Sequence, residues 1–138
     1  MKMRLEKDSL GQHGVPYYAY YGVQTQRAVE NYRISGYRAH AQLISAMGMI
    51  KKAAVRVNRK LKLIDENRAK AIECAAEEVI VGKWNGEFVV DVYQAGAGVS
   101  FHMNANEVIA NRAIEFLGGK RGCRSCCIVT MGPSLPVK

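Results

Sequence analysis

A glycine turn that leads into a helical pattern most constrains what this 138-residue chain can fold into. A short strand-like apolar stretch, Phe88-Val89-Val90, precedes the turn Gly96-Ala97-Gly98, and a dense polar set follows: Ser100, His102, Asn104, Asn106 and Glu107. A helix that starts after such a turn presents unpaired backbone N–H groups, and its dipole favours negative charge there. The segment predicts one wall of a pocket for a small anion such as a carboxylate. The alternative is a capped helix with no function of its own.

Two amphipathic helices are predicted in the middle of the chain. Between about residues 39 and 62, apolar residues at alternating spacings of four and three form one helical stripe: Leu43, Met47, Ile50, Ala54, Val57, Leu61 and Ile64. The basic residues there, Lys51 among them, lie mostly off this stripe. A second helix, capped by Asp65 or Asn67, runs to about Val81 and packs on the first as an antiparallel hairpin. Its Cys74 is expected to be a buried, inert thiol.

The two flanking regions carry turn and cap signals. Residues 1–36 are typical of an irregular arm with a short hairpin and a helical turn near Gln24–Asn31. The tyrosines of this arm are interpreted as packing residues with hydrogen-bonded tips. Arg27 is either a carboxylate partner near a site or a surface arginine. Downstream, Asn104 and Glu107 have capping-box spacing for a helix through Leu117, and an earlier start of this helix is left open because cap positions carry errors of a few residues.

Composition and motifs exclude several classes of function. The net charge of +8 raises nucleic acid as a partner, but no nucleic-acid module pattern accompanies it, so we expect no nucleic acid. The glycine turn lacks the third glycine of a dinucleotide fingerprint, and we expect no cofactor. Zinc held by Cys123, Cys126, Cys127 and His102 is disfavoured against free thiols, so no metal is assigned. No apolar run has transmembrane length and no signal peptide is visible, which predicts no membrane contact and a cytoplasmic protein.

Two long segments resemble one known family. The segment GAGVSFHMNANEVIANRA, residues 96–113, resembles the signature G-[AS]-G-T-x-x-N-M-N-x-N-E-V of the aspartase/fumarase superfamily. Residues 5–36 resemble the opening of the same family. The resemblance covers about residues 4–119, which defines a predicted N-terminal domain at 1–119 and a divergent tail at 120–138. It implies a mainly α fold: the irregular arm, the antiparallel helical hairpin and the start of a bundle helix. Asp91-Val92-Tyr93-Gln94 and Tyr20-Tyr21-Gly22 look most like aspartate ammonia-lyase.

The resemblance implies a reaction and a set of site residues. These enzymes catalyse reversible elimination to fumarate, from L-aspartate with loss of ammonia or from L-malate with loss of water. They are homo-oligomers whose active sites combine segments of three subunits, and residues 98–106 match the first segment. Substrate-binding residues carried over by that match, with Arg27 placed nearby, are Gly98, Val99, Ser100, His102, Asn104 and Asn106.

The matching segment also departs from the family. The family's substrate-binding threonine falls on Val99, which has no hydroxyl, and its first asparagine falls on His102. We interpret His102 as a hydrogen-bonded structural histidine rather than a general base. The other two site segments, including the loop with the catalytic serine, have no counterpart here, so no catalytic residue is assigned. The change of sequence after Lys120 is typical of a truncation or a change of reading frame.

The leading hypothesis is therefore an aspartate ammonia-lyase-like domain that carries one wall of a site for a small dicarboxylate and has little activity alone. A non-catalytic assembly or binding module is the first alternative. A fumarate hydratase-like protein is the second.

Overall fold

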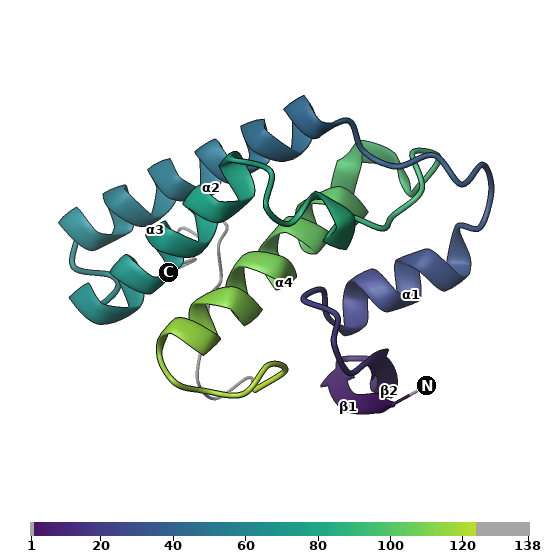
Figure 1. Cartoon of the computed structure of the whole chain (residues 1–138), viewed down its shortest axis with the longest axis horizontal. Helices are drawn as coiled ribbons and strands as arrows, with labels where there is room; N and C mark the ends of the chain where they lie inside the picture. The colour runs from purple at the N-terminus through teal and green to yellow at the C-terminus, as the bar shows by residue number, and fades with distance from the viewer. Residues whose placement is uncertain (1, 124–138) are drawn as a thin grey trace.

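The computed structural model describes residues 2–123. The elements in chain order are β1 (Met3–Asp8), β2 (Gly11–Pro16), α1 (Val23–Asn31), α2 (Ala41–Lys60), α3 (Glu66–Ile80), the 3-10 turns η1 (Asn85–Glu87) and η2 (Gly96–Gly98), and α4 (Val99–Phe116). Figure 1 shows α4 in the centre, with α2 and α3 side by side on one flank and α1 with the strands on the other. The mainly helical architecture predicted from the sequence is confirmed.

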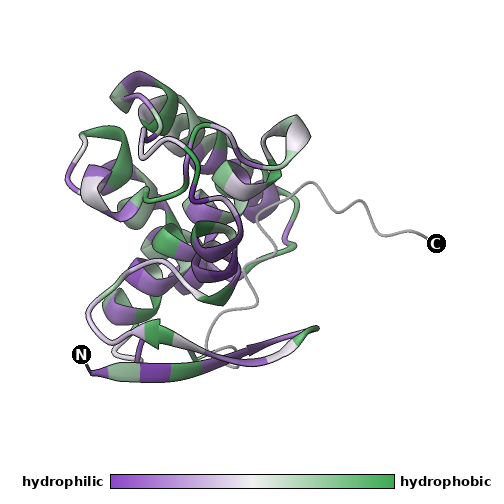
Figure 2. Cartoon of the chain, turned by 90° about the vertical axis from the view of Figure 1, so that its right-hand side faces the viewer, coloured by the Kyte–Doolittle hydropathy of each residue, from purple (hydrophilic) through white to green (hydrophobic). Residues whose placement is uncertain are grey.

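The N-terminal arm contains the short hairpin that its turn residues predicted. β1 and β2 pair antiparallel in a register that sets Asp8 opposite Gly11. Gly11 has a φ of +114°, a region that favours glycine, so the residue type suits this turn. Figure 2 shows the hairpin as a thin layer beneath the helices. The predicted helical turn near residues 24–31 is α1.

The predicted helical hairpin is also present. The side chain of Asp65 accepts a hydrogen bond from Arg68 N at 3.0 Å and caps α3, and Gly82 ends the helix at a φ of +81°. α2 and α3 run antiparallel and pack on α4 (Figure 1). The main core is drawn from these three helices together with Phe88, and its larger apolar members include Ile44, Val55, Ile72, Val79, Val108 and Ile109.

The fully buried face of α2 is not the predicted stripe, although Met47 and Ile64 of that stripe pack against the core at half-buried positions. Its buried residues are Ile44, Gly48, Lys51 and Val55. Gly48 gives the physical reason, because a Cβ at this position would lie 2.9 Å from Ile80 Cγ1 of α3. The missing side chain lets α2 approach α3 closely at this position, which favours the face that contains Gly48 as the inward one.

Two smaller sequence predictions were wrong. Cys74 is exposed rather than buried, because the inward positions of α3 are taken by neighbours such as Ile72 and Ala75. Residues 88–90 form no strand. Phe88 and Val90 are buried, but the only ladder contact recorded beside them in the described part of the chain is one bridge between Arg38 and Asp91.

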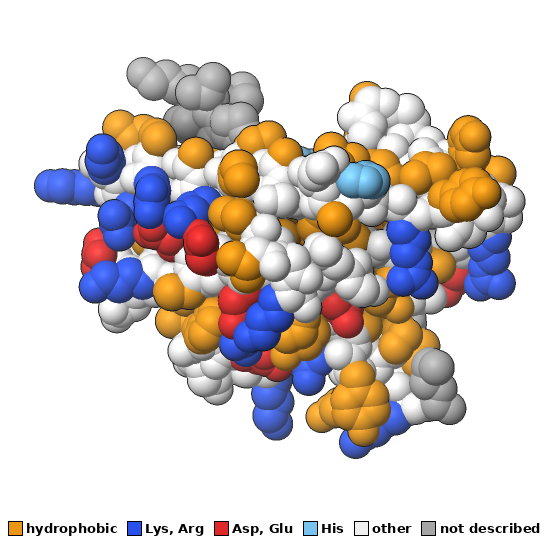
Figure 3. All heavy atoms as spheres, turned by 45° about the horizontal axis from the view of Figure 1, so that its top comes forward, with side chains coloured by type: hydrophobic (Ala, Val, Ile, Leu, Met, Phe, Trp, Pro, Cys, Tyr) orange, Lys and Arg blue, Asp and Glu red, His pale blue; other side chains and the backbone are white. Residues whose placement is uncertain are grey.

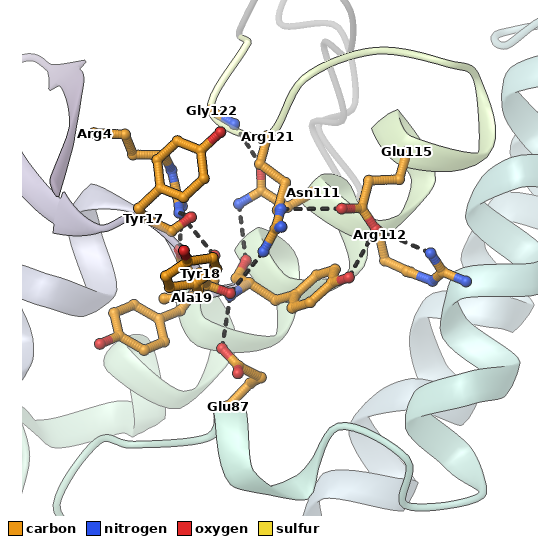
Figure 4. A network of polar contacts seen from close by, with 12 residues as sticks. Arg4, Tyr17, Tyr18, Ala19, Glu87, Asn111, Arg112, Glu115, Arg121 and Gly122 are labelled. Atoms are coloured by element: carbon orange, nitrogen blue, oxygen red, sulfur yellow. Dashed lines mark hydrogen bonds and ion pairs between the residues drawn. The ribbon is translucent and has the colours of Figure 1, made fainter. Parts of the chain in front are cut away.

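A polar network holds the tyrosine-rich segment between the hairpin and α4 (Figure 4). The guanidinium of Arg4 donates to the carbonyl oxygens of Pro16, Tyr17, Ala19 and Tyr21 at 2.7–3.1 Å. From the other side, Asn111 Nδ2 donates to Tyr20 O at 2.8 Å. The Tyr20 ring packs on Trp84 at 4.2 Å and its hydroxyl donates to Glu115 at 2.8 Å. For Tyr20, the predicted packing residue with a hydrogen-bonded tip is confirmed.

A carboxylate between α3 and α4 predicts how stability responds to acid. Glu78 accepts from Arg112 Nε at 2.6 Å, and also from Lys83 and Trp84. The Arg112 hydrogen bond, opposed by burial and helped by Lys83 and Trp84, lowers the pKa of Glu78 from 4.5 to about 2. A pKa lowered by folding stabilises the protein above the ordinary value, and this contribution is lost as pH falls toward about 2.

We therefore expect Glu78→Gln to lower the free energy of unfolding at neutral pH, and the difference from wild type to shrink between pH 4.5 and about 2. Urea titrations of both proteins across this range measure it. A difference that stays constant with pH would contradict the role given to the ionised carboxylate.

Candidate functional site

The glycine turn and the start of α4 form the predicted wall, but the helix begins earlier than its cap signal indicated. α4 starts at Val99, directly after η2, so the earlier start is the correct alternative and Asn104 is not the cap of this helix. Ala97 and Gly98 have φ values of 63° and 70°, and this left-handed turn reverses the chain and lets the helix start at once. Residues 99–102 therefore form the first turn of α4, where backbone N–H groups lack helical acceptors.

The first turn of α4 is open to an anion. Its N-cap is Gly98, which has no side chain to cap the helix. Ser100 N donates to Gln94 Oε1 at 3.2 Å, a neutral acceptor that a carboxylate could replace. Val99 is 54% exposed at the same turn. The positive end of the α4 dipole thus faces accessible space at the residues that the sequence singled out.

His102 meets a buried lysine at this end of α4. Lys51 Nζ of α2 lies 3.2 Å from His102 Nδ1, and Lys51 is only 4% exposed. Burial lowers the pKa of Lys51. Burial first, and then the positive charge of Lys51, lower the pKa of His102, which favours a neutral imidazole that accepts from the lysine. This contact agrees with the interpretation of His102 as a hydrogen-bonded histidine.

Sequence reasoning missed Lys51 as a member of this site. It was placed with the basic residues that lie off the apolar stripe, because that stripe of α2 was taken as the inward face. The available signal was a second series at spacings of four, three and four, Ile44, Gly48, Lys51 and Val55, in which the lysine replaces an apolar residue. A lysine in a core-facing series is expected to be paired or functional.

Asn104 is turned into the protein interior. It is fully buried, its Oδ1 accepts from Val89 N at 3.1 Å and its Nδ2 donates to Glu87 O at 3.0 Å. Both halves of the amide are therefore bonded to the chain between η1 and residue 90. Asn106 is half-buried on another face, with Nδ2 at 3.7 Å from Met103 Sδ. These contacts give Asn104 a structural task, and its substrate-binding role stays a prediction.

Glu107 caps a helix other than its own. Its carboxylate accepts from Gly22 N at 2.9 Å, Gln24 N at 2.9 Å and Thr25 N at 3.0 Å, all at the N-terminus of α1. α1 starts after Gly22, which supplies no side-chain cap, so a residue far along the chain satisfies its N–H groups. Members of the polar set therefore lie at two helix starts: Ser100 and His102 in the first turn of α4, and Glu107 at the N-terminus of α1.

Arg27 binds a carboxylate, and that carboxylate belongs to the chain. Its Nε lies 2.8 Å from Asp8 Oδ2 and its Nη2 lies 3.2 Å from Asp8 Oδ1, with Gly11 O at 3.3 Å. The pair clamps the β-hairpin to α1. The structure thus gathers Gly98, Val99, Ser100 and His102 around one turn and adds Lys51, while the contacts of Arg27 are with the hairpin.

Metal and membrane signals are absent from residues 2–123. Within that range no three histidine, cysteine, aspartate or glutamate residues are grouped to hold a metal ion. Cys126 and Cys127 of the disfavoured zinc set lie outside the described residues. None of the described helices is long and apolar enough to cross a membrane.

Known proteins are similar to this chain in sequence and fold. A family model described as Lyase matches residues 11–129. An aspartate ammonia-lyase from a Bacillus species is 53% identical over 120 residues, which cover 87% of this chain and 26% of the relative. A class II fumarate hydratase from Halobacterium salinarum is 54% identical over 121 residues, with coverages of 88% and 26%. The structure of a fumarate lyase:delta crystallin from Brucella melitensis superposes with a TM-score of 0.88 and 48% identity, covering 90% of this chain and 27% of that one.

These similarities bear on length and boundary as well as fold. The chain spans about a quarter of the length of the relatives it matches. The family match reaches residue 129, which lies inside the segment predicted to diverge after residue 119. That domain boundary stays a prediction.

Proposed function

This chain belongs to the lyase family of the aspartase/fumarase superfamily, and from that premise we propose that residues 98–102 form part of a site for a four-carbon dicarboxylate. The observation that carries the proposal is the open first turn of α4, where N–H groups and the dipole face accessible space beside Lys51 and His102. One carboxylate of the substrate would accept from these N–H groups and from Ser100. In an elimination, donors aimed at one carboxylate stabilise the negative charge that develops on proton removal.

The reaction we propose is that of an aspartate ammonia-lyase, with L-aspartate giving fumarate and ammonia. Fumarate hydratase chemistry is the second candidate, because relatives with the two names are nearly equally similar, at 53% and 54% identity. Both reactions share the carboxylate site proposed for residues 98–102. We expect this 138-residue chain alone to release little or no fumarate, because the other two site segments of the family have no counterpart in its sequence. Assembly as a homo-oligomer and a cytoplasmic location stay predictions.

The residues that favoured aspartate over malate have a task in the fold. Asp91 accepts from Ser35 N and Gly36 N, each at 2.7 Å, and from Tyr93 N at 2.9 Å. Burial alone would raise the pKa of Asp91, but these N–H groups and the Ser35 hydroxyl lower it to about 2. Because Asp91 anchors the loop before α2, its presence is no guide to the leaving group.

Binding of a dicarboxylate to this turn can be tested directly. In ¹⁵N-labelled protein, succinate should shift the amide resonances of residues 98–102 in a saturable manner, whereas acetate at equal ionic strength should act more weakly. L-Aspartate and L-malate are then compared with succinate in the same titration, and an ultraviolet assay of both is expected to show little or no fumarate. Equal responses to succinate, acetate and chloride would contradict a dicarboxylate site.

Restoring the hydroxyl at position 99 should strengthen binding. Val99→Thr keeps the β-branched shape at a half-exposed residue and adds one donor toward the carboxylate. A hydrogen bond to a charged group contributes about 1.5–3 kcal/mol, so succinate affinity should rise at least about tenfold. The control is Val81→Thr, at an exposed valine that caps α3 away from the turn, and it should leave affinity unchanged. An unchanged affinity for Val99→Thr would place the carboxylate elsewhere.

A further inference from the structure

The outer face of α2 carries an apolar stripe that is mostly exposed, although its Met47 also packs against the main core. Exposed members of this stripe, with their exposed fractions, are Leu43 (44%), Ile50 (64%), Val57 (53%) and Leu61 (62%). Met47 and Ala54 lie between them and are half-buried. Figure 3, which brings α2 toward the viewer, shows hydrophobic side chains along this side of the molecule. α2 is thus apolar on two faces, a property of helices that are covered on both sides.

The charges of α2 indicate what kind of surface can cover this stripe. Lys52 pairs with Glu77 of α3, and Arg56 pairs with Glu73. Arg59 lies 3.4 Å from Glu66, and Lys51 contacts His102. Four of the five basic side chains of α2 therefore contact α3 or α4. The fifth, Lys60, is exposed, and no stripe position carries a charge. An acidic partner finds no matching charge on this face. An uncharged apolar surface, in contrast, can pack against it.

A second copy of the chain supplies such a face. The stripe residues 43, 47, 50, 54, 57 and 61 have spacings of four, three, four, three and four, a series that is the same in both directions. In an antiparallel pair, Leu43 of one copy meets Leu61 of the other, Met47 meets Val57, and Ile50 meets Ala54. Alternating spacings of this kind are those of paired helices that pack knobs into holes. A two-fold interface requires such self-complementarity.

The electrostatics of pairing also favour the antiparallel arrangement. A chain of net charge +8 repels its copy, so self-association requires a contact face without basic side chains, which the stripe provides. Antiparallel helices also place the positive end of each dipole beside the negative end of the other.

We propose that α2 pairs with α2 of a second copy through this stripe, in a two-fold antiparallel arrangement. The inference uses a surface other than the carboxylate site, so it holds or fails separately from the proposed function.

Ile50→Glu and Ile34→Glu form a matched test, because both isoleucines are 64% exposed and only Ile50 lies on the stripe. In sedimentation equilibrium, wild type and Ile34→Glu should show the same concentration-dependent dimer. Ile50→Glu should raise the dimer dissociation constant at least about tenfold, because it places a charge where an apolar side chain is buried. Val57→Glu is the second variant, and thermal unfolding checks that each variant is folded. A monomeric wild type, an unaffected Ile50→Glu dimer or an equal loss in Ile34→Glu would each overturn the proposal.

The arrangement is tested by cross-linking in a background with Cys74, Cys123, Cys126 and Cys127 replaced by serine. An antiparallel pair brings residue 43 of one copy to residue 61 of the other and keeps the two residues 43 about 27 Å apart. Mixing Leu43→Cys chains with Leu61→Cys chains should therefore give a disulfide-linked dimer under mild oxidation, whereas Leu43→Cys alone should not. Cross-linking of Leu43→Cys alone, or none in the mixture, would overturn the antiparallel pairing.

Discussion

Replacing Asn104 with leucine is expected to lower the free energy of unfolding by about 3 kcal/mol, because it removes the only side chain shown bonding both Glu87 O and Val89 N among the described residues. Leucine has the same branched shape with larger methyl groups, so no cavity forms, and the loss comes from two unpaired backbone groups together with tighter packing. The segment between η1 and residue 90, which packs Phe88 into the core, would lose its attachment to α4. Urea unfolding followed by circular dichroism measures the change.

Asn106→Leu is the matched control, two residues further along the same helix. The Asn106 side chain is half-buried, and its recorded bond is the long contact with Met103 Sδ. We expect its stability to change by less than about 1 kcal/mol. Equal losses in the two variants would contradict a special role for Asn104. An Asn104→Leu protein of normal stability that fails to bind succinate would instead support the substrate-binding role implied by the family resemblance.

The contrast between these two asparagines shows where the sequence was informative. Both belong to the family signature, and sequence alone assigned both to substrate. Local signals did predict the elements: the glycine turn, the Asp65 cap of α3 and the short hairpin all depend on neighbouring residues, and each was confirmed. The direction in which Asn104 points depends on where the chain returns after α3, which no local pattern encodes.

The misassigned face of α2 has the same kind of cause. By apolar content alone, the stripe containing Leu43 and Ile50 is stronger than the series that contains Gly48 and Lys51. Close approach to α3 at Gly48 outweighs that difference, and the approach depends on a partner that the sequence does not place. The wrong choice of inward face also explains why Lys51 was missed at the candidate site. A residue placed off the inward stripe was not expected beside His102.

The start of α4 is set by the turn before it and not by the capping-box residues within it. Asn104 and Glu107 have the spacing of a capping box, but the left-handed pair Ala97 and Gly98 starts the helix at Val99. Glu107 then faces α1 and caps it from another element. A cap supplied across the fold leaves no signal at the capped helix, where Gly22 offers no side chain. The sequence did predict the glycine turn, and the turn marks where the unpaired N–H groups of α4 lie.

Replacing Glu107 with glutamine should lower the free energy of unfolding by about 2 kcal/mol at neutral pH. The carboxylate accepts from three N–H groups at the start of α1, and the amide has one oxygen fewer to offer them. Burial raises the pKa of Glu107 against the effect of these donors, so ionising it carries a cost in the fold that glutamine avoids. The net loss is therefore expected to be smaller than the sum of the three bonds.

Gly22→Ala should reproduce this loss from the other side of the contact. A Cβ at residue 22 would lie 2.8 Å from both Glu107 Oε1 and Glu6 Oε2, and the carboxylates can retreat only by giving up the N–H groups they hold. Glu66→Gln makes the same chemical change in the first turn of α3, on an exposed side chain, and should change stability by less than about 0.5 kcal/mol. If Glu66→Gln destabilised the protein as much as Glu107→Gln, charge at a helix start would explain the effect without the contact across the fold. A loss confined to Glu107→Gln and Gly22→Ala would instead mean that α4, which presents the candidate site at its first turn, also holds the N-terminal helix in place two turns later.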